Sequence, residues 1–352
     1  MRRVQFAALV LFSAITATAQ TMPPATQLRN GAARLKANAS ATKFTFVVAG
    51  DNRPAHASDP LTQPLLDLIG RVAASRPAFV VWNGDTVYGK KDVGTAAQYR
   101  QFLTAMRKLP VPVFNAPGNH EMVVQTNIPC GSAASLWNAE LPDYSGSMAA
   151  QYAKSMGAPY GMFRYGNAAF VVLNTDDVPD VAVPTACDYN GMVSQAQMTA
   201  LQSAITQLSS DATVTHIFFF MHRPIHDDSF SGIGAPAGTD YATRLTQFIN
   251  LFDNATHSKV TFVFASHDHR LYVYPTPSSP TGPFTRSVPA TTNPTFIVTG
   301  GAGAPLDGCP AANGGPAGSF FHYVTVSVDG PNVTVTVNPL YGTTPCATAA
   351  AK

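Results

Sequence analysis

The feature of this chain that most limits its fold is where its chemically active side chains occur. Short runs of branched and aromatic residues, each bounded by turn residues, recur along the chain and are typical of strands. Most of these runs are followed by a carboxylate, an amide or a histidine: Asp51, Asp85, Asn119 with His120, His222, and His267 with His269. Because ligands bind at the carboxyl ends of strands in open α/β sheets, these groups can converge on one crevice.

The order of the apolar runs indicates the fold class. We expect strands at 44–49, 79–82, 111–114, 168–173, 216–221 and 259–265, with amphipathic segments between them. The clearest helix begins at Ser194, where Gln197 completes a capping-box pattern, and Asp59-Pro60 predicts the start of another. After about Asn293 only strands follow, at 295–299, 322–328 and 333–337. The pattern predicts an α/β sandwich with mixed sheets.

The beginning of the chain indicates export. Met1-Arg2-Arg3 is basic, residues 4–15 are mostly apolar, and Ala17-Thr18-Ala19 fits signal-peptidase cleavage before Gln20. We therefore expect a signal peptide at 1–19 and a periplasmic or secreted protein. No later apolar run is long enough for a membrane span. Residues 20–43 form an N-terminal extension that we expect to be a loose leader, and residues 341–352 a C-terminal tail.

Charge and cysteine content narrow the function classes. Charged residues make up 12% of the chain and the net charge is +2, which gives no indication of a nucleic-acid groove or a polybasic membrane patch. Cys130, Cys187, Cys309 and Cys346 all follow the predicted signal peptide, and an oxidising compartment favours two disulfides among three connectivities. We favour Cys130–Cys187 and Cys309–Cys346, because each pair would tie neighbouring loops. A thiolate metal site fits less well, since no CxxC occurs.

The set of groups at the strand ends is typical of a metal site. It comprises two Asp, one Asn and three His besides His120, and oxygen and imidazole donors suit iron, manganese or zinc rather than calcium. Two such ions about 3.5–4 Å apart that share a carboxylate would activate a hydroxide and hold a phosphoryl oxygen. We therefore expect a site for two metal ions.

The order of these motifs resembles that of a known superfamily. Gly50-Asp51, Gly84-Asp85, Gly118-Asn119-His120-Glu121, His222 and His267-Asp268-His269 resemble the five motifs of the calcineurin-like metallophosphoesterases. The resemblance covers residue 44 to about residue 272, and GNHE is its most specific part. It implies a metallophosphoesterase-type αββα sandwich with two mixed sheets over residues 44–340, and hydrolysis of a small-molecule phosphate ester.

Two positions depart from the superfamily pattern. Its first motif is D-x-H, but Arg53 stands where that histidine would bind a metal, and a protonated guanidinium has no lone pair to offer. The second motif continues to Tyr88 and resembles the GDxxY of purple acid phosphatases, in which a tyrosinate replaces that histidine. A phenol ionises at neutral pH only on a strongly acidic metal such as iron(III).

The resemblance therefore implies two sets of ligands. Asp51, Asp85, Tyr88 and His269 would form a first site that holds iron(III). Asp85, Asn119, His222 and His267 would form a second site for divalent iron, zinc or manganese. A pair of divalent ions, with Tyr88 only packing, is the alternative.

The remaining polar residues have less specific expectations. In the family, the histidine that His120 matches contacts the phosphate and helps to protonate the leaving oxygen, and Glu121 would orient it. Arg53 could hold a phosphoryl oxygen or pair with a nearby Asp, and His226 could bind substrate or face solvent. We expect Asp176 and its neighbour Asp177 to be solvated loop carboxylates.

The favoured function is an exported binuclear phosphoesterase that prefers phosphomonoesters. One alternative is a divalent-metal phosphodiesterase that acts on nucleotides or lipid head groups. Another is a non-catalytic exported binding protein. The last is disfavoured, because every expected ligand position except the histidine of D-x-H is filled.

Overall fold

The structure is a computed structural model. It describes residues 21–36, 38, 40–89, 94–129, 140–143, 146–177, 191, 193–226, 240–252, 258–275, 283–308 and 318–342. The four cysteines, the predicted signal peptide and most of the predicted C-terminal tail lie outside these residues. The disulfides and the cleavage site therefore stay predictions.

The first sheet joins the beginning of the chain to its end. Its strand order is β11 (Phe284–Ser287), β14 (Asn332–Pro339), β13 (His322–Asp329), β1 (Lys43–Ala49), β2 (Val80–Asn83) and β3 (Val113–Ala116). The last three strands are parallel to one another, whereas β1 is antiparallel to β13. The carboxyl ends of β1, β2 and β3 therefore lie at one edge.

The second sheet contains the middle of the chain. Its strand order is β10 (Leu271–Tyr274), β12 (Thr295–Thr299), β9 (Val260–Ala265), β8 (His216–Phe220), β7 (Ala168–Val172) and β6 (Gly161–Tyr165). Its four inner strands are parallel and its two outer strands antiparallel to their neighbours. A separate pair consists of β4 (Val124–Pro129) and β5 (Glu140–Asp143). Both main sheets are mixed, as predicted.

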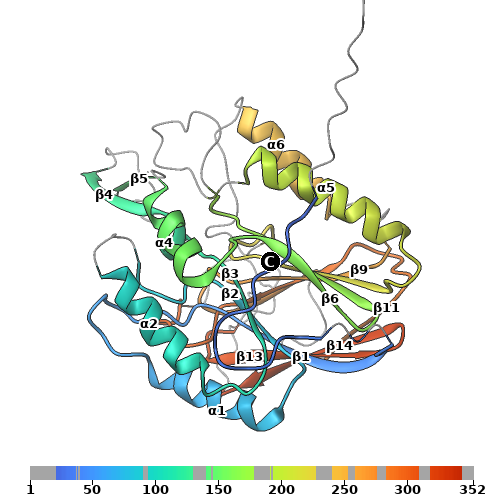
Figure 1. Cartoon of the computed structure of the whole chain (residues 1–352), viewed down its shortest axis with the longest axis horizontal. Helices are drawn as coiled ribbons and strands as arrows, with labels where there is room; N and C mark the ends of the chain where they lie inside the picture. The colour runs from blue at the N-terminus through green and yellow to red at the C-terminus, as the bar shows by residue number, and fades with distance from the viewer. Residues whose placement is uncertain are drawn as a thin grey trace, which may run out of the picture.

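Helices cover the outer faces of the two sheets, so the fold has four layers (Figure 1). α1 (Gln63–Ser75), α2 (Thr95–Met106) and α4 (Ser147–Met156) share one apolar cluster with the first sheet. α5 (Gln195–Ser210) and α6 (Asp240–Asn250) share another with the second sheet. A short helix, α3 (Asn119–Met122), follows β3. The expected αββα sandwich is confirmed.

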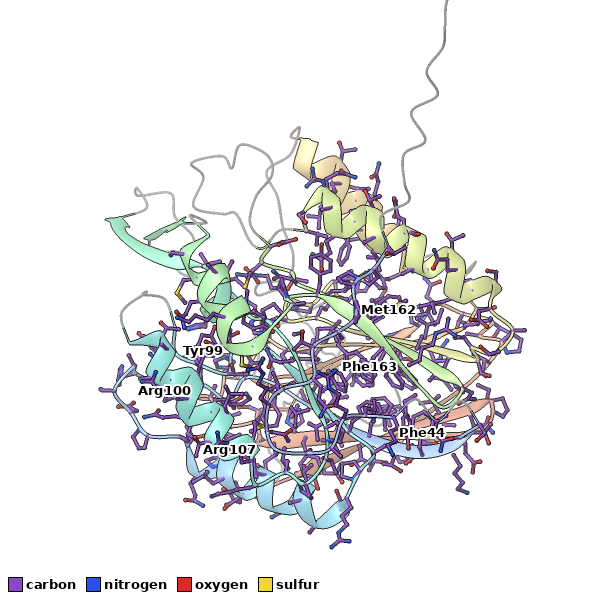
Figure 2. All side chains as sticks on the ribbon, in the orientation of Figure 1. Phe44, Tyr99, Arg100, Arg107, Met162 and Phe163 are labelled. Carbon is purple, nitrogen blue, oxygen red and sulfur yellow. The ribbon has the colours of Figure 1, made fainter. Side chains whose placement is uncertain are left out.

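Aromatic rings fill the space between the sheets (Figure 2). The rings of Phe170 and Phe218, on neighbouring strands, are stacked with centroids 5.4 Å apart. Phe46, on the first sheet, meets Phe170 edge to face at 5.3 Å. Such contacts stabilise a core beyond the area that they bury.

The N-terminal extension is packed against the domain. Pro24 forms a bridge with Met162 of β6, and Gln27 forms one with Phe114 of β3. Because β3 and β6 are edge strands of the two sheets, residues 21–36 join both edges, and we call them the N-terminal strap. These bridges show that the prediction of a loose leader is wrong for the strap. The sequence did not indicate this packing, because the strap has no periodic pattern of apolar residues.

Most elements that we expected are present. Each expected strand is found, with ends displaced by at most two residues. Ser194 accepts a hydrogen bond from the Gln197 amide and begins α5, as predicted. The start of α1 was placed too early: the helix begins at Gln63, with a proline in its first turn. Pro60 and Pro64 are both compatible with a helix start, and Pro64 is the one that lies in the first turn.

No helix in the described part of the chain combines the length and apolar character needed to span a membrane.

Candidate metal centre

Three of the predicted ligands, in loops that follow strands, have a left-handed backbone conformation. Asp51 follows β1, Asp85 follows β2 and His267 follows β9, with φ angles of 58°, 49° and 74°. Such left-handed conformations are uncommon for residues other than glycine and concentrate at functional sites. The first two loops are also joined directly, because the Asp51 amide donates to the Gly84 carbonyl at 3.1 Å.

Glu121 fixes the Asp85 loop against the GNHE segment. Its carboxylate, fully buried, accepts hydrogen bonds from the backbone amides of Asp85, Thr86, Val87 and Gly118 at 2.6–3.1 Å. Burial and nearby Asp85 raise the pKa of Glu121 to about 7, against the opposing effect of these donors. These contacts show a residue that shapes the site's backbone; the prediction that it orients His120 stays a prediction.

The second predicted site has four donor atoms close together. His222 Nε2 lies 3.2 Å from Asp85 Oδ1 and 3.0 Å from Asn119 Oδ1. His267 Nδ1 lies 3.0 Å from Asn119 Oδ1 and 3.0 Å from His222 Nε2. Ligands about 2.0–2.2 Å from a common ion lie roughly 3 Å apart, so this spacing fits a bound metal.

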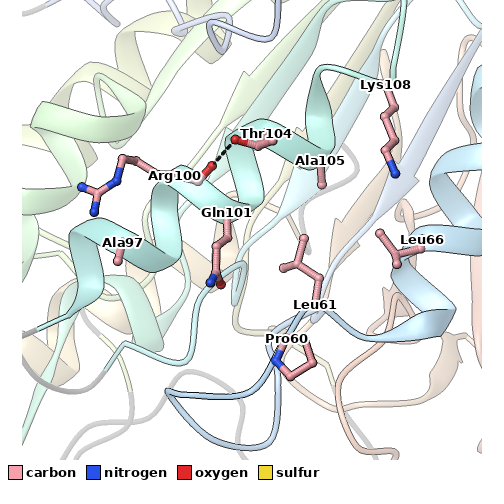
Figure 3. Close-up of a pocket in the computed structure, with 9 residues that line it drawn as sticks. All are labelled: Pro60, Leu61, Leu66, Ala97, Arg100, Gln101, Thr104, Ala105 and Lys108. Carbon is pink, nitrogen blue, oxygen red and sulfur yellow. Dashed lines mark hydrogen bonds between the residues drawn. The ribbon is translucent and has the colours of Figure 1, made fainter.

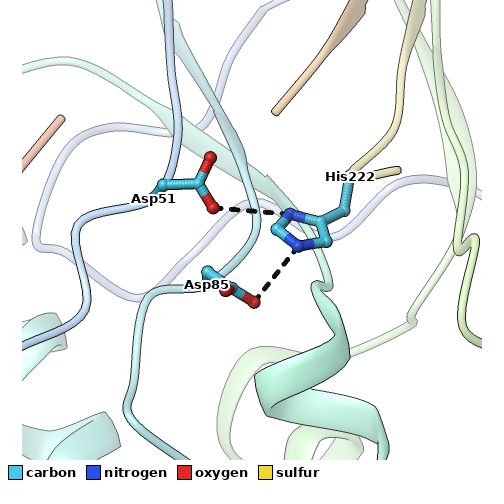
Figure 4. Close-up of side chains that lie close together, drawn as sticks. All are labelled: Asp51, Asp85 and His222. Carbon is cyan, nitrogen blue, oxygen red and sulfur yellow. Dashed lines mark ion pairs between the residues drawn. The ribbon is translucent and has the colours of Figure 1, made fainter. Parts of the chain in front are cut away.

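The His222 ring is oriented by a contact behind it. Its Nδ1 donates a hydrogen bond to the Asn83 carbonyl at 2.9 Å, which leaves the Nε2 lone pair directed at the second site. Metal-binding histidines are commonly held in this way. Figure 4 shows the ring between the two carboxylates, with Asp51 near Nδ1 and Asp85 near Nε2.

The first predicted site contains a buried carboxylate oxygen with an open coordination position. Asp51 is fully buried, and within the described residues its Oδ1 accepts no hydrogen bond. His269 Nε2 lies 3.8 Å from this oxygen, while its Nδ1 donates to the Pro305 carbonyl at 2.6 Å. Burial and the charge of Asp85 raise the pKa of Asp51. The other oxygen, Oδ2, accepts from the His267 amide at 2.7 Å. A buried carboxylate oxygen without a donor favours a cation, so these residues fit a metal as well.

The surroundings of His267 and His269 favour their neutral forms. Burial, helped by the charge of Arg223, lowers the pKa of His267. Burial and the charge of Arg53 lower the pKa of His269. Neutral rings keep the lone pairs that a metal needs.

His120, Tyr88 and Arg53 lie together beside Asp85. His120 Nδ1 donates to the Tyr88 carbonyl, and its Nε2 lies 3.7 Å from Asp85 Oδ2. The ring of Tyr88, partly exposed, meets the His120 ring at 5.9 Å. Arg53 Nε lies 3.4 Å from Asp85 Oδ2, so the expected pairing with an Asp is present.

His226 lies in a different setting. Its ring stacks on Tyr274 at 4.4 Å and meets the edge of Phe296 at 4.5 Å. Phe296 belongs to the apolar cluster under α5 and α6. The recorded ring contacts join His226 to this cluster rather than to the metal ligands, and its predicted role in substrate binding stays untested.

The sequence reasoning missed an ion pair beside the second site. Arg223 Nε donates to both carboxylate oxygens of Asp176, at 2.9 and 3.0 Å, and its Nη1 lies 3.0 Å from His267 Nε2. The prediction of solvated carboxylates is wrong, since Asp176 is fully buried and Asp177 nearly so. Asp176 follows β7, so the strand-end pattern would have found it had it been applied to that strand.

A separate hollow of 640 Å³ lies on the outside of the fold, between the start of α1 and α2 (Figure 3). Apolar residues such as Leu61 and Leu66 line it, with Arg100 and Lys108 among its polar residues. None of the predicted site residues lines it.

Solved structures share this architecture. A purple acid phosphatase from yellow lupin (Lupinus luteus) seeds matches 87% of this chain with a TM-score of 0.54 and 18% identity, and 54% of its own length is covered. A dimetal phosphatase from Danio rerio matches 87% of this chain with a TM-score of 0.51 and 16% identity, and 99% of its length is covered. The chain thus spans about half of the lupin protein, and at these identities the likeness shows the fold. Curated protein sequences gave no match.

The family of this protein is assigned by a match that spans all five sequence motifs. The family model of the calcineurin-like phosphoesterases matches residues 44–271, a range that contains every predicted metal ligand. This match covers more than half of the chain, and the protein belongs to the calcineurin-like phosphoesterase family.

Proposed function

We propose that this protein is an exported, metal-dependent hydrolase of phosphate esters that prefers phosphomonoesters. The observation that carries the proposal is the second-site cluster, in which four donor atoms from Asp85, Asn119, His222 and His267 lie 3.0–3.2 Å from their neighbours. Beside this cluster, Asp51 Oδ1 accepts no hydrogen bond within the described residues, which supports a further ion in the first site. Bound ions would lower the pKa of a water and stabilise negative charge on the phosphoryl oxygens.

The residues around the ligands suit the other parts of the reaction. The Tyr88 carbonyl fixes His120 by its Nδ1–H, so the protonated, imidazolium form of the ring would give its Nε2 proton to the leaving oxygen and become neutral. Arg53 adds a planar cation on the side of Asp85 Oδ2 and can hold a phosphoryl oxygen. A monoester carries more negative charge than a diester, so this extra cation favours monoesters.

The identity of the first metal is the finer part of the proposal. Arg53 cannot replace the histidine of D-x-H, and Tyr88 stands where purple acid phosphatases have a ligand tyrosine. The ring of Tyr88 meets the ring of His120, whose Nε2 lies 3.7 Å from Asp85 Oδ2. We assign iron(III) to the first site, with Tyr88 as a tyrosinate ligand, and divalent iron, zinc or manganese to the second.

The test combines metal content, colour and hydrolysis. Protein purified without chelator should contain iron, show a broad visible band and hydrolyse monoesters faster than diesters. Tyr88→Phe should abolish the band, whereas Tyr165→Phe, a change in β6, should keep it. A colourless protein with two zinc or manganese ions would overturn the purple-type assignment. A protein with both sites filled that hydrolyses neither class of ester would overturn the function itself.

A further inference from the structure

The two predicted sites differ in how closely their donor atoms approach one another and in what the Asp85 carboxylate contacts. In the second site, donor atoms from four segments lie 3.0–3.2 Å from their neighbours. In the first site, Asp51 Oδ1 and His269 Nε2 are 3.8 Å apart. The third donor, Asp85 Oδ2, instead faces the guanidinium of Arg53, whose Nε lies 3.4 Å away.

Arg53 is fixed beside Asp85 by its backbone and is mostly buried. Its backbone amide donates to the Asp85 carbonyl at 2.9 Å, and its side chain is only 17% exposed. His120 Nε2 lies near the same carboxylate oxygen, 3.7 Å from Asp85 Oδ2. Arg53 is therefore the guanidinium that pairs with the carboxylate shared by both predicted sites.

A second arginine beside the centre shows why Arg53 is unusual. Arg223 also lies next to a metal ligand, but its Nε binds both oxygens of Asp176, a carboxylate outside the ligand set. The charge of Arg223 is thus neutralised independently of any ion. The carboxylate that neutralises Arg53 is Asp85, the predicted bridge between the two ions.

A guanidinium and a metal ion therefore compete for Asp85 Oδ2. An ion at this oxygen would bring two or three positive charges within a few ångströms of a fixed cation at low solvent exposure. An ion that binds at this oxygen would have to displace the guanidinium from it.

We propose that Arg53 is a built-in competitor of the first metal, so that the second site fills before the first and the affinity of the first site is set by this side chain. The inference rests on the proposed two-metal function. It adds an order of metal uptake and a residue that controls it.

The test is metal binding, measured on the full chain after removal of metals. Titration calorimetry with Zn²⁺, checked by metal analysis, should give two steps for the natural chain. Arg53→Met keeps the length of the side chain and removes its charge. It should tighten the weaker step at least tenfold, which is about 1.4 kcal/mol, and leave the tighter step within twofold. Arg100→Met, which removes an exposed arginine of α2, is the matched control and should change neither step.

A second variant identifies the steps. Asn119→Ala removes a ligand of the second site alone and should weaken the tighter step. Equal affinity of both ions for the natural chain, or a weaker step unchanged in Arg53→Met, would overturn the inference. Neither result depends on hydrolysis, so the proposed activity can fail in a separate assay while this order of binding holds.

Discussion

The space between the sheets and the crevice at the strand ends are made from the same strands, yet they differ in what burial does. Between the sheets, Phe170 is fully buried against the rings of Phe46 and Phe218, and its burial stabilises the fold. At the strand ends, Asp51 is buried to the same degree but has an ionisable carboxyl group, whose pKa is raised mainly by this burial. Its burial destabilises the metal-free fold until a cation binds. Along β1, only a few residues separate Phe46, which stabilises the core, from Asp51, which belongs to the predicted metal site.

The largest expected effect comes from Asp51→Asn. Asparagine tolerates the left-handed backbone at this position but gives the metal a weaker ligand, so hydrolysis should fall about 10⁴-fold, or roughly 5.5 kcal/mol. The pKa of Asp51 is raised in the folded state, so its ionised form costs stability at pH 7. The metal-free variant should therefore melt at a higher temperature than the natural chain.

The control for this change is Asp329→Asn, which removes an exposed carboxylate paired with Lys43. It should leave hydrolysis and melting temperature almost unchanged. If metal-free Asp51→Asn melted at a lower temperature than the metal-free natural chain, Asp51 would be a stabilising residue. The contrast between core and crevice would then be wrong.

Phe170→Ala tests the other side of the comparison. Loss of this ring from a packed core should lower the free energy of unfolding by about 3–5 kcal/mol, measured by urea denaturation. Phe170→Leu keeps most of the volume and should cost less. The folded fraction of both variants should keep its metals and its hydrolysis rate within a few-fold. Loss of metal from folded Phe170→Ala would show that the aromatic core positions the ligands.

The buried histidine His322 should have a smaller effect on stability, and this effect should depend on pH. It begins β13, and its Nδ1 donates to the Phe320 carbonyl. Burial lowers its pKa to about 4 from 6.5. A lowered pKa stabilises the fold above pH 6.5, and this contribution is lost as pH falls towards 4.

Between pH 7 and pH 4 the natural chain should therefore lose about 3 kcal/mol more stability than His322→Asn, which keeps a donor for the Phe320 carbonyl. Urea denaturation at both pH values gives this difference. Equal losses in the two proteins would mean that His322 does not titrate differently in the folded and unfolded chains.

The strand ends were predictable because each signal is local. An apolar run followed by Gly50-Asp51 or Gly84-Asp85 can be seen in the sequence, and parallel strands bring their carboxyl ends to one edge. The pairing of Ser194 with Gln197 is local as well, and the structure contains it. The Gln197 side chain, however, binds the backbone of Asn174 rather than completing a capping box.

Contacts between distant residues were not predictable. Arg223 and Asp176 are 47 residues apart, and nothing near either one indicates the other. The N-terminal strap was missed for the same reason. Asn30, for example, donates to the carbonyls of Met106, Leu109 and Val111, three groups that only the folded chain brings together.

The pairing of β1 with β13 determines when the fold can be completed during synthesis. Phe44 pairs with Val328 and Val48 with Val324. One edge of β1 therefore stays unpaired until the residues of β13 have been synthesised. Until the ribosome has made them, the nascent chain carries a strand with an open edge and apolar side chains, a form that favours aggregation. β1 and β2 can pair early, which brings Asp51 and Asp85 together, but the sheet that holds these residues closes last. A chain truncated before residue 322 should therefore aggregate rather than fold, even though it retains every predicted metal ligand.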